Sequence, residues 1–205
     1  MKIVLATQSP RRHELFSGLD ISFTTRLITG IDERYPKSLD PHIVPRYIAE
    51  KKALAYKGYL GPEEIVLTAD TVVVVDGEVL GKPQSKEEAR HMLQQLSHRE
   101  HQVTTGVALM NPQGEGFSFT STTRVWFAAL SLEEIDYYLD RYKPYDKAGA
   151  YGIQEWIGYV AIERIEGSFY NVMGLPVHRV YDALQKWRVY EKNFVPLPTV
   201  IVDNK

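Results

Sequence analysis

Hydrophobic and polar positions along the chain follow two different periods, and segments of the two kinds alternate. Apolar or alternating runs are typical of strands, whereas apolar positions three and four residues apart are typical of helices. Serine followed by proline or by an acidic turn marks where helices are expected to begin. The pattern predicts strands over residues 2–6, 21–29, 65–75, 78–80, 101–110, 117–130 and 158–165, and helices over 10–17, 45–57, 85–96, 131–142 and 177–187.

The connections between these segments indicate the fold class. Asp76-Gly77 is a strong signal for a two-residue hairpin, and residues 111–114 join two long strands in the same way. Other strands are separated by helices. The sequence therefore predicts an α/β fold with a mixed sheet, in which residues 188–205 form an appended strand or arm outside the core.

Composition narrows the class of protein. The chain has 205 residues, 44% of them hydrophobic and 24% charged, which is typical of a globular protein. It has no cysteine, so disulfides and cysteine-ligated zinc are excluded, and a cytoplasmic location is compatible. A net charge of −2 argues against general nucleic-acid binding. We expect no membrane partner, because no apolar run approaches the ~20 residues of a membrane helix.

Two arginines stand at the wrong end of a predicted helix. Ser9 is the expected N-cap and Pro10 the first helical residue, so Arg11 and Arg12 lie in the first turn, where the helix dipole is already positive. One interpretation is a phosphate site made by the helix N-terminus and both guanidiniums. The other is a pair of solvated arginines that tolerate a small penalty.

Asp70 interrupts a strand that is otherwise apolar on both faces. A buried carboxylate without a partner costs several kcal/mol, so Asp70 either pairs with a buried arginine, caps a loop, binds a metal ion or activates water. The hairpin at Asp76-Gly77 would place Thr71 beside Lys82, with Asp70 on the other face. Lys82 is then a candidate phosphate ligand or a surface lysine.

The segment 146–154, DKAGAYGIQ, is rich in small residues. Such a segment lets a ligand approach the backbone, or is a tight loop packed for structural reasons. Gln154 offers a donor and an acceptor, which suits the edge of a base. The chain contains no phosphate-binding G-x-x-x-x-G-K-[ST] motif, no G-x-G-x-x-G after a strand and no G-x-S-x-G elbow.

Together these segments resemble the Maf family of nucleoside triphosphate pyrophosphatases. The matching stretches occur in family order: SPRR at 9–12, EKKA at 50–53, TADTVV at 68–73, GKP at 81–83, HQVTTG at 101–106, DKAGAYGIQ at 146–154 and GSFYNVMGLP at 167–176. The resemblance covers roughly residues 2–187 of a domain that spans residues 1–187, and residues 188–205 form a tail outside it. It implies a long mixed twisted sheet flanked by helices, with two lobes around a central cleft, similar to the inosine triphosphate pyrophosphatases.

The resemblance also implies an activity. Nucleoside triphosphates are hydrolysed to the monophosphate and pyrophosphate with a divalent cation, Mg²⁺ or Mn²⁺, and the DKAGAYGIQ form is similar to the branch that prefers dTTP and UTP. Which canonical or modified pyrimidine nucleotide is the physiological substrate is left open, and a homodimer is compatible. The implied roles are Asp70 as catalytic carboxylate, Arg11, Thr71 and Gln154 as specificity positions, Ser9, Arg12, Lys52 and Lys82 as phosphate contacts, and Glu33 with Asp70 at the metal.

Two rival functions are kept at this point. The first is a purine-selective pyrophosphatase of the inosine triphosphate type, which nucleotide profiling would separate. The second is a nucleotide-binding regulator of cell division without turnover. Asp70 favours an enzyme over the regulator, because a pure binder has no need of an acid beside a triphosphate.

Overall fold

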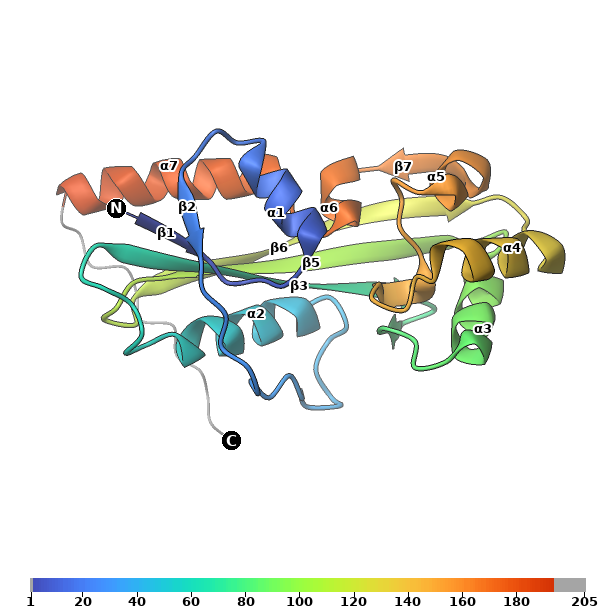
Figure 1. The fold of residues 1–205 in the computed structure, drawn as a ribbon, viewed down its shortest axis with the longest axis horizontal. Helices are drawn as coiled ribbons and strands as arrows, with labels where there is room; N and C mark the ends of the chain where they lie inside the picture. Colours follow the sequence, from blue (N-terminus) through green and yellow to red (C-terminus); the bar gives the residue numbers. More distant parts are fainter. Residues whose placement is uncertain (1, 194–205) are drawn as a thin grey trace.

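The structure is a computed structural model that describes residues 2–193, with the backbone alone for residues 188–193. Within this range one seven-stranded sheet carries helices on both faces (Figure 1). The strands are β1 (Lys2–Leu5), β2 (Phe23–Thr25), β3 (Glu64–Val75), β4 (Glu78–Leu80), β5 (Glu100–Met110), β6 (Gly116–Phe127) and β7 (Ile162–Glu166). The helices are α1 (Pro10–Ser17), α2 (Val44–Ala55), α3 (Lys86–Leu96), α4 (Leu132–Tyr142), α5 (Trp156–Ala161), α6 (Phe169–Met173) and α7 (Val177–Asn193), with a 3₁₀ turn η1 (Ala148–Ala150).

The sheet is mixed, as the sequence predicts. Its order is β2-β1-β3-β5-β6-β7, and β4 pairs with β3. The pairs β1–β2 and β1–β3 are parallel, whereas β3–β4, β3–β5, β5–β6 and β6–β7 are antiparallel. The predicted α/β fold class is therefore confirmed.

Strand β3 has an open stretch along one edge. Its other edge is paired with β5 from Val66 to Val74. On the open edge, β1 pairs with residues 64–67 and β4 pairs with residues 73–75, so residues 68–72 lie between two partner strands. Asp70 and Thr71 are in this gap, where no strand within residues 2–193 pairs with them on this edge.

Alternation along β3 sends side chains to two different layers. Ala69 and Val73 join the large core under α1, α6 and α7, whereas Val66 packs with Ala49 and Ala53 of α2 on the opposite face. Thr71 therefore faces the α1 side and Asp70 faces the α2 side.

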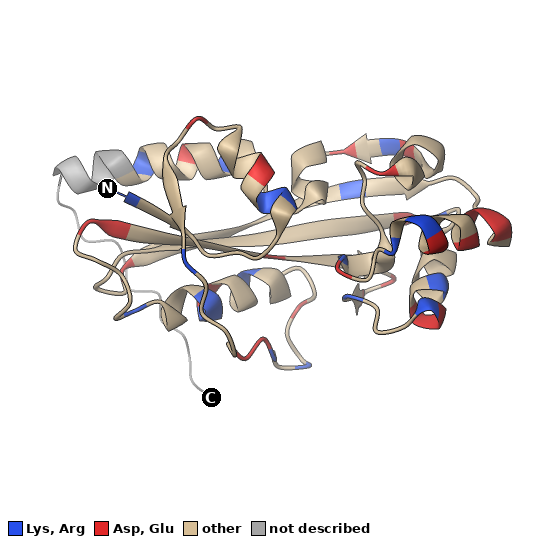
Figure 2. Ribbon diagram, viewed as in Figure 1, with Lys and Arg blue, Asp and Glu red and all other residues tan. Residues whose placement is uncertain are grey.

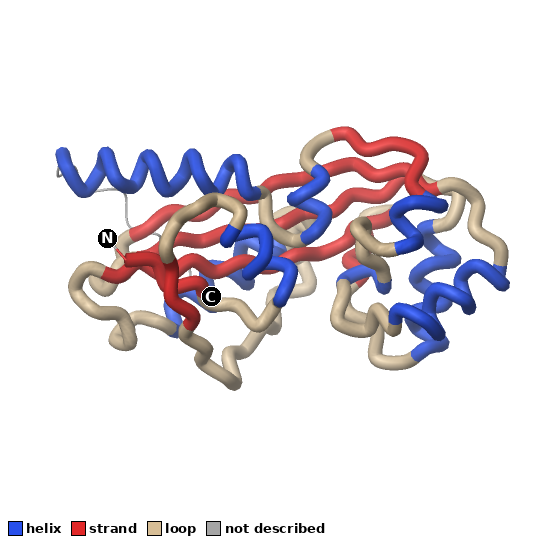
Figure 3. The backbone as a smooth tube through the Cα atoms, turned by 45° about the horizontal axis from the view of Figure 1, so that its top comes forward, coloured by secondary structure: helices blue, strands red, loops and turns tan. Residues whose placement is uncertain are grey.

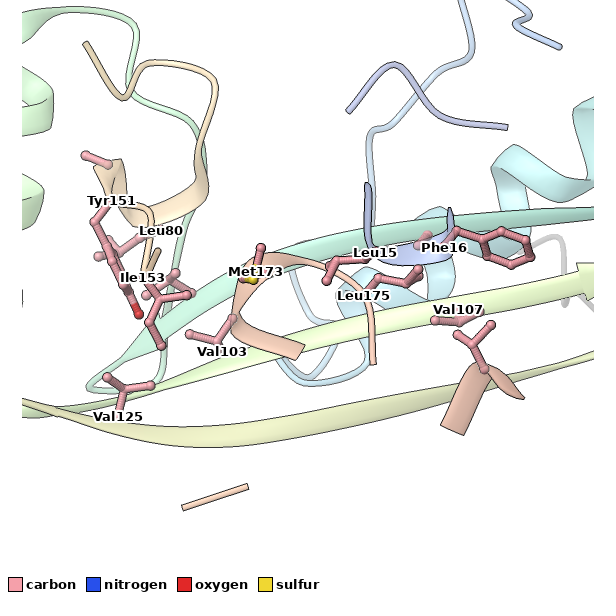
Figure 4. Close-up of a cluster of buried hydrophobic side chains, with 14 of the residues drawn as sticks. Leu15, Phe16, Leu80, Val103, Val107, Val125, Tyr151, Ile153, Met173 and Leu175 are labelled. Atoms are coloured by element: carbon pink, nitrogen blue, oxygen red, sulfur yellow. The ribbon is translucent and has the colours of Figure 1, made fainter. Parts of the chain in front are cut away.

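The large core runs along the sheet beneath the open stretch. Figure 4 shows Tyr151 and Leu80 at one end and Leu15 and Phe16 at the other, with Met173 between them. The elements on either side of the gap therefore share one close-packed hydrophobic core, which holds them in fixed positions.

The helices gather into two groups, which form the two predicted lobes. Figure 3 shows α3, α4 and α5 at one end of the long strands, and α1, α2 and α7 over the other. The open stretch of β3 lies between the groups. None of the helices within residues 2–193 is long and apolar enough to cross a membrane.

Most predicted elements are confirmed, and one turn and two helix starts can be checked in detail. Asp76 and Gly77 have φ of 50° and 80°, as a two-residue hairpin with the twist of its strands requires. Ser131 and Glu134 form a reciprocal capping box at α4. At α3, Ser85 caps the helix, but the Glu88 carboxylate accepts from the Gln84 N–H instead of closing the box.

Three predictions are wrong in part. The strand over 21–29 shrinks to β2, because its partner β1 is itself only four residues long. The strand over 158–165 begins at Ile162, since residues 156–161 form α5, whose Trp156 packs on Tyr137. The tail is not extended from residue 188, because α7 continues to Asn193. Residues 194–205 lie outside the described range.

Candidate active site

The predicted site residues meet at the open stretch of β3. Basic segments of α1 and α2 approach it from the two sides of the sheet, with an acidic segment of β3 between them (Figure 2). Two adjoining cavities of about 110 and 470 Å³ lie there. The first is lined by Ser9, Arg11, Arg12, Lys52, Asp70, Thr71, Lys82 and Gln154 among others, and the second adds Glu33.

Helix α1 presents its first turn to the cleft. The Ser9 hydroxyl accepts the Arg12 backbone N–H at 3.4 Å, and Pro10 occupies the first turn, as predicted. Arg12 Nε donates to the Gly174 carbonyl at 2.8 Å and its terminal nitrogen donates to Thr71 Oγ1 at 3.0 Å. Arg12 therefore joins α1 to β3 and to the end of α6.

Both arginines have protein partners, which changes the expectation for the free protein. Arg11 Nη1 donates to Asp146 Oδ2 at 2.8 Å across the cleft. Burial lowers the pKa of the Arg12 guanidinium, although the nearby Asp70 carboxylate opposes this shift. The sequence alone suggests a mild electrostatic liability, whereas the structure shows that hydrogen bonds offset the unfavourable helix dipole.

Arg12→Ala should consequently destabilise the ligand-free protein. Loss of two hydrogen bonds is expected to cost about 1–2 kcal/mol, which lowers Tm by roughly 2–8 °C in a chain of this size. The measurement is thermal unfolding with and without pyrophosphate, and the stabilisation by pyrophosphate should also shrink. Arg11→Ala is the matched control, because its pair with the exposed Asp146 should contribute little. A higher Tm for Arg12→Ala would show that dipole repulsion outweighs these bonds.

Lys52 links the two predicted acidic residues. Its Nζ donates to Asp70 Oδ1 at 2.8 Å and lies 3.1 Å from Glu33 Oε1. Lys52 can reach β3 because α2 packs tightly on the sheet at Gly106, where a Cβ would lie 2.1 Å from the Arg46 nitrogen. The partner of Asp70 is thus a lysine, and the alternatives of a buried arginine or a loop cap are wrong.

Asp70 and Glu33 each place a carboxylate oxygen within 3.1 Å of Lys52 Nζ, and carboxylate oxygens are ligands that suit a hard divalent cation. Among the described residues no group of three His, Cys, Asp or Glu side chains is placed to hold a metal ion. Two carboxylates are too few for a closed protein cage, so any cation here needs further oxygen ligands from the substrate.

Lys82 reaches the cleft by a different route from the one predicted. The pairing of β4 with β3 ends at Leu80, so the expected cross-strand pair of Lys82 with Thr71 does not form. Lys82 instead lies on the loop after β4, exposed, and lines both cavities. The Gly81 carbonyl accepts the Gly149 N–H at 3.0 Å, which ties this loop to the 146–155 segment.

Gln154 lines the smaller cavity. Its Oε1 is buried without a hydrogen-bond partner among the described residues, although buried amide oxygens are nearly always paired. The neighbouring Tyr151 is fixed by its hydroxyl, 2.8 Å from His101 Nε2. Burial lowers the pKa of His101 to about 3, so this histidine is neutral at physiological pH.

The sequence analysis missed the ionic contacts of the 146–155 segment. Lys147 Nζ lies 2.8 Å from Asp146 Oδ1 and 3.1 Å from Glu155 Oε1. The other Glu155 oxygen accepts the Tyr138 hydroxyl, and that hydroxyl accepts the Gly152 N–H at 3.0 Å. Burial raises the pKa of Asp146, but hydrogen bonds from Lys147 and Arg11 outweigh it and lower the value to about 2. In the sequence, the only sign of these contacts is that acidic residues, Asp146 and Glu155, stand at the two ends of a segment rich in small residues.

A family model described as Maf-like protein matches residues 2–187. The chain belongs to the Maf family. The match ends where the resemblance of the sequence motifs ends. All seven stretches that carry the resemblance lie within it, so the Maf assignment and the geometry of the cleft concern the same residues.

Named relatives within the Maf family are close. A protein of Porphyromonas gingivalis named dTTP/UTP pyrophosphatase is 60% identical over 186 residues, which are 90% of this chain and 93% of that protein. One of Parabacteroides distasonis with the same name is 55% identical over 90% of this chain and 95% of its own length. Among solved structures, the Staphylococcus aureus Ham1 protein aligns with 62% of this chain and 72% of its own, at 18% identity and a TM-score of 0.47.

Proposed function

We propose that the protein hydrolyses dTTP and UTP to the nucleoside monophosphate and pyrophosphate. Relatives that are 55–60% identical to this chain, over nearly their whole length, are named for this activity. The cleft supports the same reaction, because it places cationic side chains from α1, α2 and the loop after β4, together with the Asp70 carboxylate, next to the unpaired Gln154 Oε1.

The observation that carries the proposal is the buried, unpaired Oε1 of Gln154. An unsatisfied buried acceptor is costly unless a ligand pairs with it. Thymine and uracil share an N3–H donor between two carbonyl acceptors, and a primary amide can pair with part of that edge. The cavity that holds Gln154 continues to Arg11, Arg12 and Lys52, where a triphosphate would lie.

Asp70 is the residue that activates the attacking water in this proposal. Its Oδ1 is held by Lys52, whereas Oδ2 makes no hydrogen bond to the described residues and is free to accept a proton from water. Lys52 has three N–H donors, of which Asp70 uses one, and Glu33 lies within ion-pair distance, so a donor is left for a phosphate oxygen.

A divalent cation fits the carboxylate oxygens of Asp70 and Glu33. Magnesium is commonly held by one or two carboxylates together with substrate phosphates, and this donor set matches that arrangement. We therefore propose that Mg²⁺ or Mn²⁺ binds with the triphosphate. When bound, the cation supplies Lewis-acid polarisation of the phosphoryl oxygens.

The remaining phosphate contacts stabilise the leaving pyrophosphate. Arg12 and Lys82 line the cavity as cations, and Ser9 uses its oxygen as a helix cap while its hydroxyl proton stays available to a phosphate. Preorganised donors of this kind lower the barrier by meeting charge that develops on the leaving group.

A nucleotide profile tests the proposal. Pyrophosphate release by the unmodified protein should be measured as kcat/KM for dTTP, UTP, CTP, GTP and ATP with Mg²⁺ and with Mn²⁺. Thymine and uracil differ by one methyl group, worth about 1 kcal/mol, so dTTP and UTP should agree within roughly tenfold. CTP and the purine triphosphates should be poorer by about 100-fold or more, because they leave the Gln154 amide unpaired.

Other outcomes point to the rival functions. Preference for a purine triphosphate would favour an enzyme of the inosine triphosphate type. Tight dTTP binding without pyrophosphate release in either metal would favour a nucleotide-binding regulator. Release of phosphate instead of pyrophosphate would contradict attack at the α-phosphorus.

The compartment and the assembly are part of the same proposal. We expect a cytoplasmic protein, in keeping with the absence of cysteine, and a homodimer. Light scattering of the purified protein would test the second expectation directly.

A further inference from the structure

The 146–155 segment is held by a chain of paired polar and charged residues, and its members other than Arg11 have no assigned role in the proposed chemistry. From the phosphate end of the cleft it runs through Arg11, Asp146, Lys147 and Glu155 to Tyr138, and each contact is an ion pair or hydrogen bond. Lys147 is 8% exposed and Tyr138 is fully buried. Buried charges are retained only where they are paired, so these contacts fix the segment in one conformation.

The Glu155 side chain does not cap the helix that it precedes. It is the N-cap residue of α5, where a side chain normally accepts a backbone N–H of the first turn, yet it makes no such bond. Its carboxylate instead contacts Lys147 and Tyr138. Because Gln154 is the preceding residue, the direction of its side chain depends on these two contacts.

Tyr138 holds the segment on both sides of Gln154. Its hydroxyl donates to Glu155 and accepts from the backbone N–H of Gly152. Burial and the adjacent Glu155 carboxylate raise the pKa of the Tyr138 hydroxyl, which keeps it a donor. A Cβ at position 152 would lie 3.0 Å from Glu155 Cδ and 3.1 Å from Lys147 Cε, so a larger residue there would have to displace these two side chains.

We propose that Tyr138, Glu155 and Lys147 are positioning residues that aim the Gln154 amide at the pyrimidine, an inference that rests on the proposed function. The same chain reaches Arg11 through Asp146.

Tyr138→Phe is the primary test, because it removes one hydroxyl and leaves the ring in the core. The expected result is a KM for dTTP raised about tenfold, a kcat within threefold of the original and a preference for dTTP over CTP reduced about tenfold. Protection against thermal unfolding by pyrophosphate should not change. Tyr142→Phe is the matched control, since Tyr142 stacks on Tyr138 in α4 but makes no hydrogen bond within the described residues.

A double-mutant cycle separates positioning from general loss of structure. If Tyr138 acts through Gln154, the Tyr138→Phe change has little left to disturb once Gln154 is alanine. In a Gln154→Ala protein it should therefore change the preference for dTTP over CTP by less than about twofold. Glu155→Gln retains an acceptor for Tyr138 and should lose less selectivity than Glu155→Ala. A purely structural role would lower the rates for all nucleotides together in both backgrounds.

The outcomes distinguish this inference from the proposed function. If the unmodified protein prefers dTTP and UTP, and Gln154→Ala removes that preference while Tyr138→Phe and Glu155→Ala leave it unchanged, the positioning role is overturned. If the unmodified protein shows no pyrimidine preference, the proposed function itself has failed. If Tyr138→Phe does not fold, Glu155→Gln and Glu155→Ala give the same comparison.

Discussion

Asp70→Asn is expected to reduce turnover of dTTP by at least about 100-fold, the lower range for loss of a general base. Asparagine keeps the shape of the side chain and one acceptor for Lys52, so the cleft should keep its geometry. It cannot take a proton from water and is a poorer ligand for a hard cation. Binding of dTTP should stay measurable, because Arg12 and the other phosphate contacts remain.

The control for this variant lies on the same β-hairpin. Asp76→Asn changes another aspartate to asparagine at the turn after β3, where a positive φ suits either residue. It should have normal activity, because Asp76 is exposed and pairs with Arg99. Single-turnover pyrophosphate release and calorimetric dTTP binding are the measurements. Activity of Asp70→Asn within threefold of the original would remove Asp70 from the role of base.

Local features of the sequence were good predictors of individual elements. Ser9-Pro10 placed the start of α1 correctly, and Asp76-Gly77 placed the turn between β3 and β4. These signals act over a few residues, through a cap or a turn that the side chain itself determines. The strand predicted over 158–165 is wrong for residues 158–161, because they belong to α5, whose Trp156 packs on Tyr137 of α4, a contact that no local window contains.

The arrangement of the cleft could not be predicted in the same way. Asp70 is conspicuous in the sequence as an acid in an apolar strand, but its exposure depends on two short strands that pair with the same edge of β3 and leave a gap. Its partner Lys52 comes from another element, and Gly106 permits the close packing that brings it near. Long-range register and helix packing of this kind are not encoded in any local window.

Resemblance to the family identified Gln154 but not the residues that hold it. Lys147 lies within the DKAGAYGIQ motif, and Glu155 directly follows it, yet composition alone favours a tight loop whose small residues serve packing. Tyr138 belongs to a separate amphipathic helix, where an aromatic residue is most simply explained as core. Only the three-dimensional contacts show that its hydroxyl faces this segment.

Gln154→Ala is expected to abolish the discrimination between bases. The alanine variant should lose about 100-fold in kcat/KM for dTTP and UTP, since a site built around a polar edge depends strongly on that pair. CTP, GTP and ATP should lose less than about fivefold, because they do not use the same pair in the unmodified protein. Gln113→Ala, in the exposed β5–β6 turn, is the matched control and should leave all five values unchanged.

The buried oxygen of the Gln154 amide makes a more specific prediction about which bases are accepted. Gln154 Oε1 is buried without a hydrogen-bond partner among the described residues, and the group that complements this acceptor is a donor, such as the N3–H of thymine or uracil. Cytosine has a bare acceptor at N3, and pairing with it would require the amide to rotate and expose its NH₂ group instead. Gln154→Glu fixes an acceptor at this position and removes that option, so its residual activity should stay confined to dTTP and UTP, with kcat/KM for CTP below that of the unmodified protein. If Gln154→Ala instead lowered all five rates equally, Gln154 would belong to the scaffold of the segment and another group would have to read the base.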